Sequence, residues 1–429
     1  MSAREDVDFF SEASLIENPY PYFDDLRSTC PVLPLPHLGV VAVTGYDAAT
    51  EVYRDPATFS SCNSVVGPFA EFPVPLEGDD IGEIVDRHRG QLPMHEHMVT
   101  MDPPAHTRER ALLMKLITPK RLKENEEFIR RLAERQVDGF IAAGRCEFVR
   151  DYAQPFALIV VADLLGVPET DHDRFRERFG LTAAPGAITG EQVGDGGDLN
   201  ALSWLDEWFA RYVEDRRRQP QRDVLTDLAL ATYPDGGTPE VAEVVRSATF
   251  LFAAGQETTA RLLAAALKYL AEHPGSQDEL REHPERIPDF VEETLRLESP
   301  VKTDFRLALR STTVAGVEVK AGTPVMLLNG AANRDPEHFP CPAELRTDRP
   351  NLRTHIAFGR GVHSCPGSPL ARVEARVSIE RILDRTRDIR LSPEHHGPAE
   401  ARRFDYEPTW MLRGLSKLHL EFTPMGAGS

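Results

Sequence analysis

The feature that most constrains this chain is a long helical pattern that polar and small residues interrupt at its centre. Apolar spacing predicts one helix over residues 238–273, with Thr238 as its N-cap. At 1.5 Å per residue, such a helix spans roughly 54 Å and crosses a whole domain. Its middle, AGQETT, contains Gly255, Glu257 and Thr258. Glycine and threonine weaken a helix and an unpaired carboxylate is costly to bury, so this stretch predicts a functional site.

Length and composition point to one domain that is large enough to enclose a cofactor. No Ser/Gly-rich linker or break in composition divides the 429 residues. The formal charge of −19 argues against nucleic-acid binding as the main role. The N-terminal stretch lacks the apolar core of a secretory signal, and no apolar run is long enough to span a bilayer. We therefore expect a cytoplasmic protein that does not bind membranes.

The order of patterns along the chain predicts a mainly α fold with a minor β region. Mixed helix and strand signals occupy about 17–60 and 304–350, and a helical body occupies about 105–300. The irregular segment 61–104 between them is of a length that is usually functional. Shorter helices are expected within the body at 119–143, 151–166, 199–218 and 222–232. The Gly-rich run at 186–200 reads as a mobile connection.

One of five scattered cysteines stands where a thiolate is favoured. The sequence contains no CxxC pair, and its cysteines are Cys30, Cys62, Cys146, Cys341 and Cys365. Cys365 follows a Gly-bearing loop and directly precedes a strongly helical pattern. Backbone N–H groups and the positive end of the helix dipole stabilise a thiolate there. It lacks partners for an iron–sulfur cluster, but it can serve as the single axial ligand of heme, or it can be a buried structural cysteine.

The loop around Cys365 resembles that of a known family. Phe358, Gly361, Cys365 and Gly367 match the FxxGxxxCxG heme loop of the cytochrome P450 family, the heme-thiolate monooxygenases. The resemblance implies the cytochrome P450 fold of the soluble bacterial members, as one compact heme-enclosing domain over 1–429 with its heme loop at 358–367. It also implies heme b with Cys365 as axial ligand, and O2 as co-substrate.

Two further segments resemble parts of the family that support heme. EETLR contains Glu293 and Arg296 in the family's ExxR arrangement, and Arg349 in RTDRP would lock to this pair as structural support. The resemblance implies a set of heme-propionate partners, for each of which a surface salt bridge is the ordinary alternative: His106, Arg110, Arg306 and His363. It also places three residues against the heme: Ala254, Phe358 and Gly367.

The segment AGQETT resembles the family's oxygen-side helix. In that comparison Thr258 takes the position of the proton-delivering alcohol and Glu257 is the adjacent acid. Small side chains at Ala254 and Gly255 would let the helix approach the heme. We expect the Thr258 hydroxyl to bond to a helix carbonyl and to loosen the helix, so that a water can enter. The alternative is a helix with an ordinary polar flaw.

The resemblance also implies a substrate pocket with mostly apolar walls. Its candidate residues, each of which can equally be plain core, are Phe69, Phe72, Leu92, Leu181, Leu251, Val301, Phe305, Trp410 and Met411. An apolar wall favours a small hydrophobic substrate, such as a terpenoid or aromatic compound. The expected reaction is hydroxylation or oxidative demethylation at a C–H bond. Lys302 is expected to face the surface.

The sequence shows no flavin-binding or nicotinamide-binding segment, so the resemblance implies electrons from a separate ferredoxin and an NAD(P)H-dependent ferredoxin reductase. Basic residues that can form a docking face, or equally a solvated one, are Arg108, Lys115, Lys120, Arg121, Arg360 and Arg372. Two alternatives to the monooxygenase remain open. One is a peroxide-dependent peroxygenase, and the other is a non-enzymatic heme-thiolate sensor or carrier.

Overall fold

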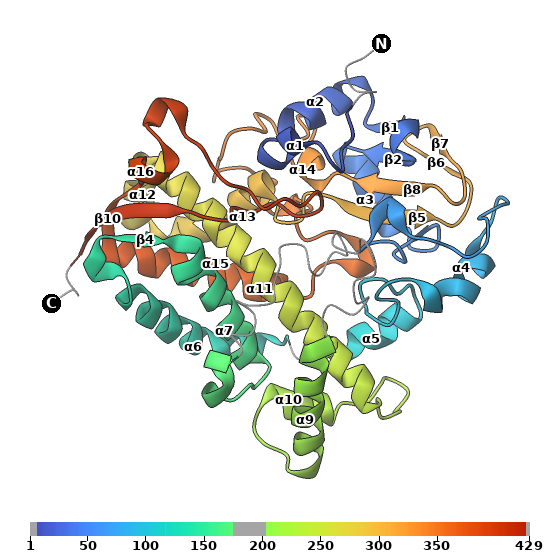
Figure 1. Cartoon of the computed structure of the whole chain (residues 1–429), viewed down its shortest axis with the longest axis horizontal. Helices are drawn as coiled ribbons and strands as arrows, with labels where there is room; N and C mark the ends of the chain where they lie inside the picture. Colours follow the sequence, from blue (N-terminus) through green and yellow to red (C-terminus); the bar gives the residue numbers. More distant parts are fainter. Residues whose placement is uncertain (1–6, 116, 175–202, 426–429) are drawn as a thin grey trace.

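Helix α11 (Val241–Glu272) is the axis of the molecule. The structure, a computed structural model, describes residues 7–115, 117–174 and 203–425. Within it α11 is one continuous helix of 32 residues that crosses the fold diagonally (Figure 1). Its N-cap is Glu240, whose side chain forms a capping box with Glu243. The prediction of Thr238 as the N-cap is therefore wrong, because the reciprocal carboxylate cap at Glu240 and Glu243 satisfies the N–H groups two residues further on.

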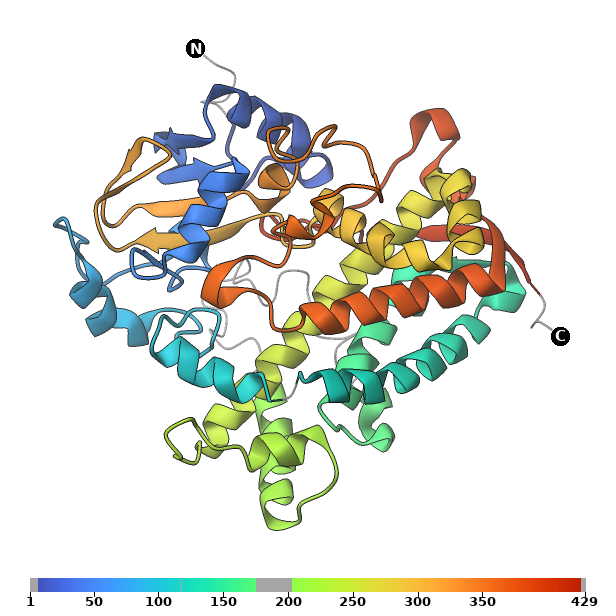
Figure 2. The ribbon, with the colours of Figure 1, turned by 180° about the vertical axis from the view of Figure 1, so that it is seen from behind.

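The other helices surround this axis. The four that pack against its length are α7 (Gln154–Leu164), α9 (Ser203–Arg218), α13 (Ile287–Glu298) and α15 (Ser368–Arg385). On the far side of the molecule, α15 runs beside α6 (Pro119–Asp138), as Figure 2 shows. The remaining helices are α1 (Ala13–Glu17), α2 (Tyr20–Thr29), α3 (Tyr46–Arg54), α4 (Gly82–His88), α5 (Ala105–Leu113), α10 (Val224–Ala229), α12 (Pro274–Glu282), α14 (Asn329–Ala332) and α16 (Pro393–His396).

A five-stranded sheet occupies one corner of the molecule (Figure 1). Its strands, in spatial order, are β1 (Val32–Leu35), β2 (Val40–Val43), β8 (Pro324–Leu327), β5 (Asp304–Ala308) and β3 (Phe59–Ser60). Neighbours are antiparallel except for the parallel pair β2 and β8. The sheet thus joins the two sequence regions in which mixed helix and strand signals were expected.

Two smaller sheets complete the β structure of the described residues. One contains β4 (Arg145–Glu147), β10 (His419–Pro424) and β9 (Thr386–Leu391), all antiparallel. The other is a hairpin of β6 (Thr312–Val314) and β7 (Val317–Val319). The fold is mainly α with a minor β region, as the sequence predicts.

The two ends of α11 belong to different hydrophobic cores. Buried residues from Val244 to Ala253 pack with α7, α9 and α10. Buried residues from Ala260 to Ala271 pack in the larger core with α6, α7, α13 and α15. The segment 254–259 lies between these two cores and belongs to neither. At this segment α11 borders a cavity instead of a packed core.

Gly255 has a packing role that the sequence did not reveal. A Cβ atom at this position would lie 2.9 Å from Val161 Cγ2 on α7. Since real Cβ atoms do not approach other carbons so closely, glycine is what lets α7 and α11 pack at this distance. Gly255 therefore serves helix packing in addition to keeping the cavity wall thin.

Candidate active site

A cavity of about 280 Å³ lies between the middle of α11 and the loop that precedes α15. From α11 its wall receives Phe250, Leu251, Ala254, Gly255, Thr258 and Thr259. From the opposite side it receives Phe358, Gly359, His363, Cys365, Pro366 and Gly367. The two segments that the sequence singled out, AGQETT and the cysteine loop, therefore face one another across this cavity.

The loop is fixed by a glycine that no other residue can replace without strain. Gly361 has a φ of +68°, and a Cβ atom on it would lie 2.1 Å from the carbonyl oxygen of Tyr53 on α3. Further along, the N–H of Cys365 donates to the carbonyl of Phe358 at 2.9 Å. This tight return delivers the thiol just before Ser368, where α15 begins.

Opposing effects act on the Cys365 thiol. Burial raises its pKa, whereas the backbone N–H groups of Gly367 and Ser368 and the charge of Arg110 lower it. In the protein alone burial dominates, so the helix end does not by itself produce a thiolate, contrary to the simplest expectation. A bound metal ion deprotonates a coordinating thiol outright, so the thiol is poised to become a metal ligand.

Unsatisfied polar atoms at the rim of the cavity fit the carboxylates of heme. The rings of His106 and His363 lie 4.0 Å apart between centroids. Within the described part of the chain, both ring nitrogens of His106, Nε2 of His363 and Nη1 of Arg110 are buried without a hydrogen-bond partner. Arg306 also lines the cavity, and its Nη1 donates to Asp304 Oδ1 at 3.0 Å. Buried donors without acceptors are costly, and anionic oxygen atoms would satisfy them.

Burial lowers the pKa of His106 to about 4, and the charges of Arg110 and Arg306 add to this shift. Burial, with Arg306, His106 and Arg110, also lowers the pKa of His363. The two imidazoles are thus neutral while the two guanidinium groups carry the positive charge. An entering carboxylate would meet net positive charge and N–H donors. The residues present therefore fit a heme whose propionates point to this rim.

Thr258 bonds to its own helix, as expected, but does not break it. Its Oγ1 donates to the carbonyl oxygen of Ala254 at 3.0 Å. The helix nevertheless stays α-helical through 241–272. The hydroxyl bond therefore forms within a continuous helix, and the entry of a water at this point stays a prediction. Thr258 still exposes its side chain to the cavity.

Glu257 is engaged on another side of α11. Arg261 Nη1 donates to Glu257 Oε2 at 3.1 Å, and Arg261 Nε donates to Glu407 Oε2 at 2.8 Å. Burial raises the pKa of Glu257, Arg261 opposes the rise, and Glu407 adds to it. Glu257 is absent from the cavity wall among the described residues. One guanidinium between two buried carboxylates leaves an excess negative charge that a proton can neutralise.

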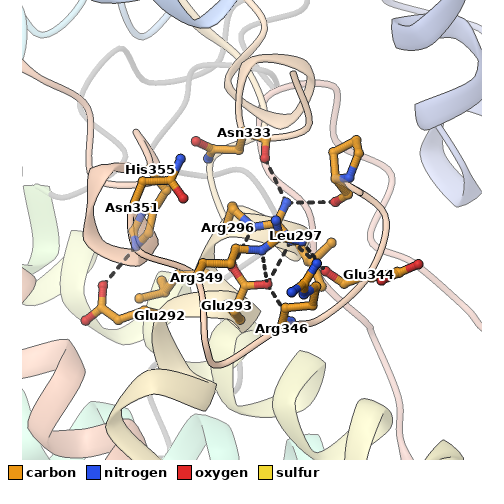
Figure 3. A network of polar contacts seen from close by, with 12 residues as sticks. Glu292, Glu293, Arg296, Leu297, Asn333, Glu344, Arg346, Arg349, Asn351 and His355 are labelled. Carbon is orange, nitrogen blue, oxygen red and sulfur yellow. Dashed lines mark hydrogen bonds and ion pairs between the residues drawn. The ribbon is translucent and has the colours of Figure 1, made fainter. Parts of the chain in front are cut away.

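The ExxR pair forms a completely buried network (Figure 3). Arg296 bonds to Glu293 through Nε at 2.6 Å and Nη2 at 2.9 Å, and Arg349 Nε reaches the same carboxylate at 3.0 Å. The prediction that Arg349 joins the pair is confirmed. Arg296 also donates to the carbonyl groups of Asn333, Pro342 and Glu344. Burial alone would raise the pKa of Glu293, but Arg296 and the other donors hold it below its usual value.

Few of the residues predicted for the substrate pocket line the cavity. Leu251 and Val301 do, whereas Leu181 lies outside the described residues. Six others are absent from the described wall: Phe69, Phe72, Leu92, Phe305, Trp410 and Met411. Five of these six belong to two separate apolar clusters, Phe305, Trp410 and Met411 in one and Phe72 and Leu92 in the other.

Three aromatic members of that set, Phe69, Phe305 and Trp410, form a cluster with Phe10. Phe305 and Trp410 stack edge to face at 5.4 Å, and Trp410 meets Phe10 at 5.2 Å in the same manner. Phe69, which lies 5.0 Å from Phe10, is 58% exposed. The expected surface position of Lys302 is also wrong: it is 3% exposed, and its Nζ donates to the carbonyl of Thr409 at 2.9 Å. A lysine can be buried here because its ammonium group finds an acceptor inside the fold.

The structure adds wall residues that the sequence analysis missed. The apolar additions are Met98, Val99, Leu113, Val161, Phe250, Leu262 and Leu295. Phe250 lies one helical turn before Ala254, so helix periodicity alone could have found it. Glu374 on α15 also reaches the cavity, is 1% exposed, and has an Oε2 without a partner in the described chain. Burial raises its pKa well above the usual range, so it is a neutral acid.

The basic residues proposed as a docking face have different surroundings. Lys120 is exposed, with its Nζ 3.8 Å from Glu124. Arg121 pairs with Asp227, and Lys115 Nζ donates to the carbonyl of Thr232 at 2.6 Å. Arg372 bonds to Glu292 at 2.5 Å, Arg360 donates to the carbonyl of Thr354, and Arg108 stacks on Tyr233. Most of these charges are therefore already committed within the fold.

Comparison with known proteins places these observations in one family. The sequence model described as Cytochrome P450 matches residues 200–387. Cytochrome P450 144 of Mycobacterium tuberculosis is 35% identical over 394 residues, which covers 90% of this chain and 87% of the relative. Vitamin D(3) 25-hydroxylase of Pseudonocardia autotrophica is 31% identical over 432 residues, which covers 99% of both. The solved structure of Mycobacterium marinum cytochrome P450 CYP150A6 in the substrate-free form is 58% identical with a TM-score of 0.92, and the match covers 99% of this chain and 100% of that one.

The chain belongs to the cytochrome P450 family. It is accordingly an oxidoreductase of the monooxygenase type, and its cofactor is heme b with a cysteine thiolate ligand and O2 as co-substrate. None of the helices in the described part of the chain has the length and apolar character that crossing a bilayer requires.

Proposed function

We propose that this cytochrome P450 inserts one oxygen atom from O2 into a C–H bond of a small hydrophobic substrate, with Cys365 as the thiolate ligand of its heme. The observation that carries the proposal is that the Cys365 thiol and the Thr258 hydroxyl line one apolar cavity from opposite elements. When bound, heme would supply the activation of O2, which the axial thiolate promotes by donating electron density.

The cofactor would be held by residues of both sides of the cavity. His106, Arg110 and His363 would bind its two carboxylates through the unsatisfied nitrogen atoms at the rim, and Arg306 would add a second guanidinium group there. Phe358 and Gly367 would contact the ring from the cysteine side, and Ala254 from the side of α11. In this arrangement Arg110 has a second anchor, because its Nη2 donates to the carbonyl of Ser364 at 2.7 Å.

Protons would reach the reacting centre through Thr258 and Glu257. The Thr258 hydroxyl stands in the cavity and can hold or pass a proton at Oγ1 while it remains tied to Ala254. Glu257 directly precedes Thr258, and burial raises its pKa, which favours its protonated form as a proton carrier. It would leave Arg261 when protonated, since the ion pair then loses its charge, and rotate toward Thr258.

The apolar wall supports a hydrophobic substrate of the terpenoid, aromatic or polycyclic type. Leu251, Val301 and the additional apolar residues Phe250, Met98 and Leu113 leave few polar contacts in the cavity. A relative named for the hydroxylation of vitamin D(3) supports the same class. The reaction would be hydroxylation, or oxidative demethylation where the oxidised carbon is a methyl group on oxygen or nitrogen.

Electrons would come from a separate ferredoxin and its NAD(P)H-dependent reductase. Lys120, which is exposed at the start of α6, and Arg372 on the neighbouring α15, which is partly exposed although it also bonds to Glu292, support docking of an acidic iron–sulfur protein. Because the formal charge of the chain is −19, such docking would depend on this local patch and weaken with added salt.

The decisive experiment concerns the ligand. The reduced carbon monoxide complex of the wild-type holoprotein should show the strongly red-shifted Soret band of thiolate ligation, and Cys365→Ser should abolish it. Cys30→Ser, at the end of α2 and outside the described cavity wall, is the matched control and should keep the band. Survival of the band in Cys365→Ser would place the ligand elsewhere.

A further inference from the structure

A small polar pocket of about 10 Å³ adjoins the cavity at the N-terminal side of its α11 wall. The two spaces share three lining residues, Met98, Leu113 and Phe250. Beyond Phe250 the wall becomes polar and receives Glu96, His97, Glu109, Arg246 and Ser247. The mostly apolar cavity is thus bordered by a pocket with polar walls roughly two turns of α11 away from Ala254.

His97 is the feature of this pocket that points to a ligand. Its side chain is 7% exposed, and neither ring nitrogen has a hydrogen-bond partner among the described residues. Its backbone is fixed on both sides: the N–H donates to Met94 at 2.8 Å, and the carbonyl accepts from the N–H of Thr100 at 3.1 Å. The ring lies 6.0 Å from that of Phe250. The imidazole of His97 is thus buried beside the cavity with two nitrogen atoms unused. It needs a polar partner that the fold itself does not supply.

The surroundings of His97 favour a neutral partner over a charged one. Burial lowers its pKa, Asp206 and Glu96 oppose this, and Arg246 adds to it. The neutral imidazole therefore offers one N–H donor and one nitrogen acceptor. Arg246 already forms an ion pair with Glu96 at 3.4 Å. Glu109 accepts a hydrogen bond from the Tyr233 hydroxyl at 2.9 Å. No excess positive charge is left for a carboxylate.

We propose that His97 binds a neutral oxygen, of a hydroxyl or a ketone, at the far end of an elongated hydrophobic substrate. This deepens the proposed function and rests on it. Ser247 in the polar pocket precedes Ala254 in the cavity by seven residues, which is about 10 Å along the helix. The bound oxygen would therefore lie on the order of 10 Å from the carbon that is oxidised. His97 would fix which carbon that is, as a residue that determines regioselectivity.

The test uses two rigid four-ring probes, testosterone, which carries oxygen at both ends, and 5α-androstane, which carries none. Dissociation constants come from the substrate-induced spin shift of the ferric holoprotein. The variants are His97→Phe, which keeps an aromatic ring without donor or acceptor, and His97→Gln, which keeps both. His95→Phe is the control, because His95 lies in the same segment and its Nδ1 contacts the carbonyl of Leu92 instead.

The wild-type protein should bind testosterone at least tenfold more tightly than 5α-androstane. His97→Phe should weaken testosterone about tenfold and leave 5α-androstane unchanged, whereas His97→Gln and His95→Phe should stay within threefold of the wild type. If His97→Phe does not fold, two measurements still test the proposal. They are the ratio of the wild-type dissociation constants for the two probes and the affinity of His97→Gln for testosterone.

Equal affinity of the wild type for the two probes, no spin shift with either, or equal losses for both in His97→Phe would each overturn the polar subsite. In these outcomes the red-shifted Soret band of the carbon monoxide complex stays intact. Absence of that band in the wild type would instead mean that the proposed function fails.

Discussion

Two groups of polar residues at buried positions in this protein differ in their hydrogen bonding. In the network of Glu293, Arg296 and Arg349, the three side chains bond to one another and to backbone carbonyl groups. At the cavity rim, His106 is buried and Arg110 is partly buried, and both have buried nitrogen atoms without a hydrogen-bond partner in the described chain. The first group finds its partners within the protein, and the second leaves nitrogen atoms that a ligand can satisfy.

This difference gives a physical criterion for telling structural from functional polar residues. Taking a charge out of water costs several kcal/mol, and a fold repays this cost only when partners are in place. A network that repays it internally fixes the segment before the cysteine loop relative to α13. A group beside a cavity that leaves donors unused can instead bind a ligand that enters the cavity. The polar pocket at His97 has the same signature on a smaller scale.

The largest effect is expected from breaking the complete network. Glu293→Gln removes the charge that compensates Arg296, whose side chain is fully buried. Removing one partner of a buried ion pair costs about 3–5 kcal/mol, so the free energy of unfolding of the holoprotein, measured by denaturant titration, should fall by that amount. Glu279→Gln breaks the exposed pair with Arg286 and should cost at most about 1 kcal/mol. Equal losses in the two variants would contradict the comparison.

A substitution among the polar residues at the cavity rim should change how tightly heme is held and should leave the stability of the apoprotein nearly unchanged. Arg110→Ala removes the donor proposed to bind a heme carboxylate, and a lost charged partner of this kind costs about 1–3 kcal/mol, or roughly 5- to 150-fold in heme release. Transfer of heme to apomyoglobin measures that rate. Unfolding of the apoprotein should change little. Arg108→Ala, which loses only the stacking on Tyr233, is the control and should release heme at the wild-type rate.

Thr258→Ala tests the proton path and should leave heme binding intact. Product formation should fall by roughly 10²-fold, the lower range for a positioned proton donor, while reductant is still consumed and peroxide is released. The measurement is product formed per reductant oxidised. Thr249→Ala provides the control, because Thr249 is buried on the same helix but is not among the described cavity residues. An unchanged product yield in Thr258→Ala would refute its assignment as the proton-delivering alcohol.

The smallest effect is a shift in pH dependence. The negative charge of Glu407 contributes to the raised pKa of Glu257, so Glu407→Gln should lower that pKa and leave Arg261 to Glu257 alone. A proton donor is lost as pH rises through its pKa. The alkaline limb of the coupling profile should therefore move to lower pH in Glu407→Gln. Movement to higher pH, or none, would show that Glu257 does not carry the proton. Glu272→Gln, which breaks a more distant pair with Lys268, should not shift the profile.

Much of the site was predictable because its signals are local. The spacing from Gly361 to Cys365 describes one loop whose geometry is fixed by a positive φ and a close backbone contact. Glu293 and Arg296 lie one turn apart on a helix, so their pairing follows from helix geometry alone. The apolar pattern predicted α11 and the break in its apolar face at 254–259, although not the capping box at the start of the helix.

Other parts were not predictable because they depend on which distant segments meet. Phe305 and Met411 have the apolar character of pocket residues, but the strand and turn that carry them direct them into a separate core. Lys302 is buried because a carbonyl from residue 409 lies within reach. The pairing of Glu257 with Arg261 and Glu407 likewise joins positions almost 150 residues apart.

The sequence by itself determined the long helix, the cysteine loop, the paired charges of α13 and thereby the family, since each depends on neighbours within a turn or a loop. Only the tertiary structure decided which polar groups are satisfied and which still need a partner. Hydrogen-bond satisfaction depends on atoms supplied by remote segments, and no local pattern specifies their positions. The atoms without hydrogen-bond partners at the rim and at His97 can therefore be identified from the folded protein but not from its sequence.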